Sequence, residues 1–262
     1  YLLSIGFLKK EMNRLIKLIP VLLGFIFSQM PFQEGEKLVY SAGFRLFAAG
    51  TATMEIVSDS LGGSSVYRII SRTRTGGLLD RFYRVRDEID VWLDKGDFNL
   101  LRMNKKIREG SHKKNFHAII DTSNNTATMG DKTLELPDHV LDPMSAIYFL
   151  RMQDLSLGKN YSFNSFDNGK LKNVLVSVKK EETISVPAGI FKCILVTPSS
   201  GDGSALLKNN GQMKIWFSAD NQKIPVKIEQ NTNIGTMILE LKKVVIPLIE
   251  EAADVIEHDD NK

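Results

Sequence analysis

Residues 51–75 read TATMEIVSDSLGGSSVYRIISRTRT. Apolar and polar side chains alternate through Thr51–Ser58 and again through Val66–Thr75. A period of two is typical of a β-strand with one buried face, because successive side chains point to opposite faces. Asp59–Ser65, between the two runs, is rich in glycine and serine, which favour turns. The stretch therefore predicts two antiparallel strands joined by a turn or short loop.

The same alternation recurs along most of the chain, so we expect an all-β protein with an antiparallel sheet. A bend at Ala48–Gly50 is expected to precede the run that begins at Thr51. Gly130 and Asp131 predict a hairpin, and Lys170–Val186 is long enough to predict a bend or bulge within it. Further strands are expected at Glu36–Phe47, Tyr83–Leu93, Leu100–Arg108, Lys113–Asp121, Thr126–Met129, Lys132–Leu136, Asn160–Asp167, Gly189–Pro198, Gln212–Ala219, Lys223–Gln230 and Gly235–Val245.

One segment interrupts the strands and reads DPMSAIYFLRMQ at residues 142–153. Asp142 is a suitable N-cap, Pro143 suits the first helical position, and good helix formers follow. The segment therefore predicts an α-helix near 142–153. Because it is apolar almost all round, we expect the helix to be buried.

The beginning of the chain has the layout of a cleavable secretory signal peptide that starts at Met12. Basic side chains precede a short apolar stretch at 18–27, and Ser28 offers a small residue for cleavage. The apolar stretch is shorter than the roughly 20 residues that a membrane span needs. Gln29 stands where a lipoprotein would have its cysteine. We therefore expect a soluble, periplasmic or secreted protein that is not a lipoprotein and has no stable membrane span after cleavage.

The net charge changes when this segment is left out. The full chain has a formal charge of +3, but residues 1–28 hold four basic side chains and one acidic one. The remainder is neutral overall, which does not favour a nucleic-acid partner. We expect residues 29–248 to form a single β-rich domain and the acidic tail 249–262 to fray. Cys193 is the only cysteine, so an internal disulfide is excluded.

Several short landmarks follow one another along the chain. They are FQEGEKLVY at 32–40, GTA at 50–52, IREG at 107–110, DxxSxxYxxR at 142–151, VPAGIF at 186–191, IWFSAD at 215–220 and IPV at 224–226. In this order they resemble the exported bacterial family called domain of unknown function 3108. The resemblance implies a periplasmic protein with a rolled or spiral antiparallel sheet, a β-roll or open barrel, into which the helix packs. It implies no established activity and no catalytic residues.

The residues show no catalytic constellation, so we predict no catalytic residue, no metal site and no cofactor. Cys193 has no local histidine or cation to activate it and is expected to be a small core residue. His112 and His117 are five apart in a predicted strand, so they face opposite sides. Strand carboxylates leave a glycoside-hydrolase pair open, although solvated strand faces commonly carry them. These carboxylates are Glu34, Glu36, Asp87, Glu88 and Asp90.

Tyr148 and Arg151 lie three residues apart, on one face of the predicted helix. An arginine in so apolar a helix needs a partner, since an unpaired buried charge is very costly. One interpretation is a structural salt bridge to a strand carboxylate. The other is a polar grip at the mouth of a pocket, in which Tyr148 and Arg151 bind an anionic head group.

Basic side chains outnumber acidic ones between residues 66 and 114. Arg68 and Arg72 share one predicted strand face, and Arg84 and Arg102 belong to similar faces of the strands that follow. If these faces are aligned, they form a basic surface for anionic lipid, lipopolysaccharide or acidic glycan. The alternative interpretation is an ordinary solvated face that nearby acidic side chains partly neutralise.

These features favour a non-enzymatic protein of the bacterial envelope that binds an amphipathic or anionic ligand, lipid or glycan, or a partner protein. An envelope hydrolase acting on glycan or peptide is an alternative, and it requires a cleft in which catalytic side chains converge. A structural scaffold subunit is another alternative. In that case we expect Glu36–Val57 or Gly235–Val245 to form an exposed edge that pairs with another chain.

Overall fold

The structure is a computed structural model that describes residues 30–44, 47–77, 79–202, 206, 211–232 and 235–247. The predicted signal segment at 1–28 and the predicted acidic tail at 249–262 lie outside the described residues. Most of the described chain is β-strand, which confirms the all-β prediction. The strands are β1 (Lys37–Phe44), β2 (Phe47–Leu61), β3 (Ser64–Thr75), β4 (Arg86–Asp94), β5 (Leu100–Glu109), β6 (His112–Asp121), β7 (Thr126–Met129), β8 (Lys132–Glu135), β9 (Asn160–Asp167), β10 (Lys170–Val186), β11 (Gly189–Ser200), β12 (Met213–Ser218), β13 (Pro225–Thr232) and β14 (Gly235–Val245).

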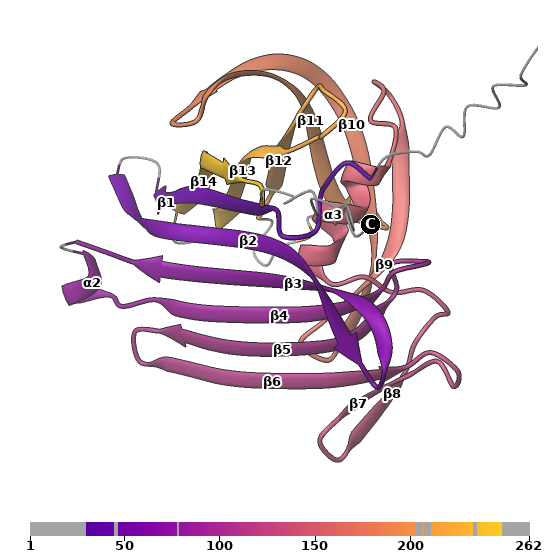
Figure 1. Ribbon diagram of the computed structural model, residues 1–262. Coiled ribbons are helices and arrows are strands. Elements are labelled where there is room, and N and C mark those ends of the chain that lie inside the picture. Colours follow the sequence, from indigo (N-terminus) through magenta and orange to yellow (C-terminus); the bar gives the residue numbers. More distant parts are fainter. Residues whose placement is uncertain are drawn as a thin grey trace, which may run out of the picture. The chain divides into compact units, whose positions relative to one another are not determined.

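The strands form one 14-stranded sheet in the order β8-β7-β6-β5-β4-β3-β2-β1-β14-β13-β12-β11-β10-β9. Neighbouring strands are antiparallel, and the sheet is not closed, since β8 and β9 are its two ends. It curves around the helix α3 (Pro143–Met152), so the expectation of a rolled sheet with a buried helix is confirmed (Figure 1). The long hairpin of β10 and β11 also reaches β14, where the Ala188 N–H donates to the Leu241 carbonyl oxygen at 2.9 Å.

The placement of β1 and β14 contradicts the expected exposed edge. β1 pairs with both β2 and β14, so neither Glu36–Val57 nor Gly235–Val245 is an edge of the sheet. The true edge strands are protected. β8 has only four residues. The outer edge of β9 is covered by Leu141, whose backbone forms hydrogen bonds with the backbones of Asn164 and Phe166. Short or covered edges are typical of sheets that do not add a further strand.

The first hairpins differ from the expectation in the position of their turns. β1 ends at Phe44 and β2 begins at Phe47, so Ala48–Gly50 belongs to β2 and is not the expected bend. Glycine is required at position 50 because a Cβ would lie 1.9 Å from a carbonyl oxygen of β3. The next turn is shorter than expected and is made by Gly62 and Gly63, whose φ values are 60° and 86°.

The other elements follow the predictions closely. α3 confirms the helix, and β7 and β8 form the hairpin around Gly130. The register between β10 and β11 shifts between Val178 and Lys180, which confirms the predicted irregularity in the long strand. β4 begins at Arg86 instead of Tyr83, because a short helix, α2 (Leu79–Phe82), precedes it.

Candidate functional site

A cavity of about 190 Å³ lies between one face of α3 and the concave face of the sheet. Its wall contains side chains from β2, β3 and β4 and from β9 to β14. α3 contributes Pro143, Met144, Ala146, Ile147 and Leu150. Residues that are far apart in the sequence therefore meet here only because the sheet curves around the helix.

The wall of the cavity is apolar and adaptable. Several of its side chains are methionines, whose flexible thioethers fit irregular apolar shapes. They are Met54, Met144, Met213 and Met237. The polar side chains of the wall are Ser71, Thr73, Ser165 and Gln230. No charged side chain of the described residues lines the cavity. This chemistry suits an apolar molecule better than an ion or a sugar.

The local sequence explains how α3 begins beside the cavity. The buried Asp142 carboxylate accepts hydrogen bonds from the N–H groups of Met144 and Ser145 at 3.0 and 2.8 Å. Ser145 Oγ in turn accepts the Asp142 N–H at 2.8 Å. This capping box satisfies amides that have no partner within the helix. Burial raises the pKa of the Asp142 carboxyl, and the Lys105 charge and these hydrogen bonds oppose the rise.

Tyr148 and Arg151 do not line the cavity. Arg151 is fully buried and donates from Nη1 and Nη2 to the two carboxylate oxygens of Glu36, at 2.5 and 3.0 Å. It also donates to the carbonyl oxygens of Pro31 at 2.7 Å and Gln222 at 3.1 Å. The structure therefore contains the structural salt bridge. Binding of a head group by Tyr148 and Arg151 stays a prediction, and these contacts do not favour it.

Tyr148 packs the start of the described chain against α3. Its ring lies edge-on to that of Phe32, with centroids 5.3 Å apart and planes at 88°. Its buried hydroxyl has no hydrogen-bond partner within the described residues. Burial raises the pKa of the Tyr148 phenol. Tyr148 is therefore a neutral side chain that acts through packing.

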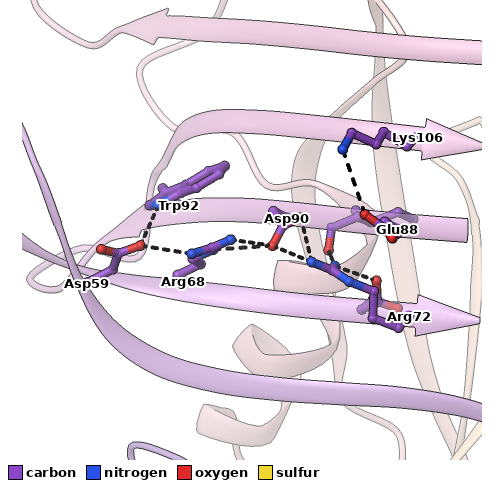
Figure 2. Close-up of polar contacts among 9 residues, drawn as sticks. Asp59, Arg68, Arg72, Glu88, Asp90, Trp92 and Lys106 are labelled. Atoms are coloured by element: carbon purple, nitrogen blue, oxygen red, sulfur yellow. Dashed lines mark hydrogen bonds and ion pairs between the residues drawn. The ribbon is translucent and has the colours of Figure 1, made fainter.

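Arg68 and Arg72 lie on the convex face of the sheet, because they alternate along β3 with the side chains that line the cavity. Figure 2 shows both guanidinium groups against Asp90, at 2.8 Å from Arg68 and 3.0 Å from Arg72. Arg68 also approaches Asp59 at 3.4 Å, and Trp92 Nε1 donates to the same carboxylate at 3.0 Å. The neutralised, solvated face is thus the arrangement found for these two arginines.

The other two predicted arginines have different surroundings. Arg84 follows α2, has a side chain that is 70% exposed, and lies 3.5 Å from Asp80. Arg102 stacks on Trp92, with Cζ 5.0 Å from the ring centroid. Its Nε is buried without a hydrogen-bond partner in the described part of the chain. The structure therefore brings Arg102 near Arg68 across the Trp92 ring, whereas Arg84 lies elsewhere.

The groups considered for catalysis lie apart from the cavity. Cys193 is fully buried in the core, and burial raises the pKa of its thiol to about 11. Glu36 and Asp90 are held in ion pairs with arginines. Asp87 and Glu109 form a carboxyl pair that the sequence did not predict. Burial and the neighbouring Asp87 carboxyl raise the pKa of Glu109. Within the described residues, no group of three or more His, Cys, Asp or Glu side chains could hold a metal ion.

The sequence matches a family model described as a protein of unknown function (DUF3108) over residues 39–242. The match extends over most of the chain. The chain belongs to the DUF3108 family. A search of curated proteins finds no significant match to it. No helix among the described residues of this DUF3108 protein is long and apolar enough to cross a membrane.

The fold of the chain is similar to that of a solved structure. The chain resembles a β-barrel-like protein of domain of unknown function DUF1849 from Brucella abortus, with 12% identity and a TM-score of 0.54, covering 82% of this chain and 98% of that one. It also matches a candidate exported protein with a YmcC-like fold from Bacteroides fragilis, with 13% identity and a TM-score of 0.33, covering 83% and 98%. At these identities, the first likeness shows a shared fold alone.

Proposed function

We propose that this protein is a non-enzymatic binding protein of the bacterial envelope, which holds the apolar chain of a lipid-like ligand between α3 and the rolled sheet. The observation that carries the proposal is the apolar cavity of about 190 Å³. A cavity of similar size, about 150 Å³, stays dry and binds small apolar molecules when its wall is aliphatic and aromatic. Each buried methylene of a ligand contributes about 0.8 kcal/mol.

The lining favours a lipid chain over the other ligands considered. A glycan needs many hydrogen-bond partners, and the wall offers only a few hydroxyl and amide groups. A hydrolase needs a carboxylate or histidine at the substrate, and neither type of side chain lines this cavity within the described residues. The methionines let the wall adapt to the bends of a flexible chain. An export signal, predicted from the sequence, agrees with a ligand found in the envelope.

The first test is native mass spectrometry of the protein purified gently from the envelope in which it accumulates. We expect an added mass that organic extraction removes and that lipid analysis identifies. A second measurement displaces a fluorescent fatty-acid analogue from the purified protein. A protein that carries no lipid mass and binds no analogue contradicts the proposal.

Variants that fill the cavity can be compared with a variant that makes the same change on the surface. Ala146→Leu on α3 and Ala52→Leu on β2 each place three further carbons in the lining, whereas Ala188→Leu makes the same change at an exposed position. We expect the first two variants to lose at least about tenfold in affinity for the analogue, since each occupies space that the ligand needs. The two cavity variants are independent, so one that fails to fold leaves the other. Equal affinity in a folded cavity variant and in Ala188→Leu would sink the assignment of the site.

A further inference from the structure

Phe82 and Tyr83 project an aromatic surface from the end of the β3–β4 hairpin. Phe82 is 79% exposed and Tyr83 is 48% exposed, although both are large apolar residues. Arg81 and Arg84 flank them, and both are also exposed. We call residues 81–84 the aromatic turn. Figure 1 shows α2, which ends within it, beyond the ends of β3 and β4. A scattered apolar side chain on a surface is ordinary, but two adjacent aromatic rings between arginines are a distinct feature.

The aromatic turn is held in place rather than left loose. Asp80 accepts hydrogen bonds from Thr75 Oγ1 at 2.7 Å and from both terminal nitrogens of Arg86 at 2.7 and 2.9 Å. On its other side, the Gly110 N–H donates to the Arg84 carbonyl oxygen at 2.8 Å. The Tyr83 ring covers Gly110 so closely that a Cβ there would lie 2.9 Å from the ring. Phe82 is therefore presented to solvent on a fixed support, which lowers the entropy cost of binding.

The surroundings of the turn carry an excess of positive charge. Arg74 pairs with Arg86 across β3 and β4, and Arg108 pairs with Lys113 across β5 and β6. The Asp80 carboxylate is shared by two arginines: it binds Arg86 and lies 3.5 Å from Arg84. The basic side chains near the turn are Arg74, Arg81, Arg84, Arg86, Arg108 and Lys113. The acidic ones are Asp80, Asp87 and Glu109. A surface of this composition attracts anions.

From this arrangement we infer that the aromatic turn docks the protein on an anionic lipid bilayer. Aromatic rings favour the interface between head groups and acyl chains, and arginines beside them contact anionic head groups. A stable protein interface buries about 800 Å² on each partner, far more than two rings supply. The aromatic turn is separate from the cavity, since none of its residues lines the wall. The inference therefore stands independently of lipid binding inside the protein.

The test is flotation of the purified, exported protein with vesicles of phosphatidylcholine that contain about 30% phosphatidylglycerol, at low salt. We expect the protein to float with these vesicles, to float far less with pure phosphatidylcholine, and to be released by added salt. Phe82→Ser should weaken binding about tenfold, through lost apolar burial. Arg81→Gln and Arg84→Gln should each weaken it about fivefold, which is the effect of one basic side chain near an anionic surface.

The controls make the same chemical changes elsewhere on the surface. Ile190→Ser removes an apolar side chain that is 76% exposed on β11, and Lys170→Gln removes an exposed positive charge on β10. Both should float as the wild type does. The inference is overturned if the wild type does not float with anionic vesicles, if the controls lose as much binding as the turn variants, or if envelope proteins rather than vesicles retain the protein through Phe82. Lipid binding in the cavity is read by mass spectrometry and is unaffected by any of these outcomes.

Discussion

At the scale of the residue, Arg151 joins three segments that are distant in the sequence. Its guanidinium group binds Glu36 and the carbonyl oxygens of Pro31 and Gln222, so α3 is connected to the start of the described chain and to the β12–β13 loop. The guanidinium carbon also lies 5.5 Å from the centre of the Phe32 ring. A buried ion pair adds little stability compared with a pair of apolar side chains of similar volume. Removing one partner of the ion pair is nevertheless strongly destabilising, because the other charge stays buried and unpaired.

Replacing Arg151 with methionine should therefore lower the free energy of unfolding by about 3–5 kcal/mol, because Glu36 would remain buried without a counter-charge. Chemical denaturation monitored by fluorescence measures the change. Lys192→Met, which makes a comparable replacement at an exposed position of β11, is the control and should change stability by less than about 0.5 kcal/mol. An Arg151→Met protein that is as stable as the control contradicts the role assigned to the ion pair.

At the scale of the element, α3 depends on its first turn. The helix has ten residues, and a helix of that length is marginal by itself, so the cap and the packing decide its stability. Asp142 provides the cap with a carboxylate that is completely buried. One face of the helix lines the cavity, and Arg151 on the helix binds Glu36. A change at Asp142 therefore acts on the cavity wall through the position of α3.

Asp142→Ala should lower the free energy of unfolding by about 1–2 kcal/mol, and Asp142→Asn by less, because asparagine retains an oxygen for capping. The raised pKa of Asp142 sets the pH dependence. The unfolded carboxyl loses its proton near pH 4, before the folded one does, so this group destabilises the wild type as the pH rises through that range. Asp142→Asn should become more favourable relative to the wild type between pH 3 and pH 7. Denaturation at several pH values measures the difference, and a pH-independent difference contradicts the expected cost of burying this charge.

At the scale of the whole molecule, the sheet holds its first and last strands in the middle. β1 pairs with β14 along its length and β2 lies on the other side, so the centre of the sheet is fixed by contacts between the two ends of the described chain. The two halves of the sheet then extend outward to β8 and β9. The order of the strands explains why the cavity has walls from both halves: the rolled sheet brings residues of β2–β4 and of β9–β14 into the lining of one cavity beside α3.

Hydrogen exchange measured by mass spectrometry under native conditions should follow this arrangement. Amides of β1 should exchange slowest, because Leu38, Tyr40 and Ala42 are buried in the core and both neighbours of β1 are strands. Amides of β8 should exchange fastest among the strands, because β8 is a short, exposed edge. Protection of β8 equal to that of β1 contradicts this order of local stability.

Much of the fold was predictable because it is local. The alternation in β2 and β3 and the cap of α3 are properties of neighbouring residues, and the strands and the helix occur close to where these patterns place them. The apolar helix with one arginine also indicated that Arg151 has a partner, and a buried ion pair was one of the two interpretations. The predicted position of the first turn was wrong. Glycine is needed at position 50 because the backbone of β3 lies too close for a Cβ, and not because the chain turns there.

The all-β class, the buried helix and the need of Arg151 for a partner could all be inferred from the sequence, because alternation of side chains and burial of charge are visible within short segments. The three-dimensional structure adds that Glu36 is this partner and that β1 lies beside β14. It also shows that Arg68 and Arg72 are paired with Asp59 and Asp90. It also decided that apolar side chains around α3 leave a cavity instead of filling it. Strand pairing and side-chain packing bring together residues that are far apart in the chain. The alternation along a strand shows which side chains face the core, but it does not show which other side chains they contact.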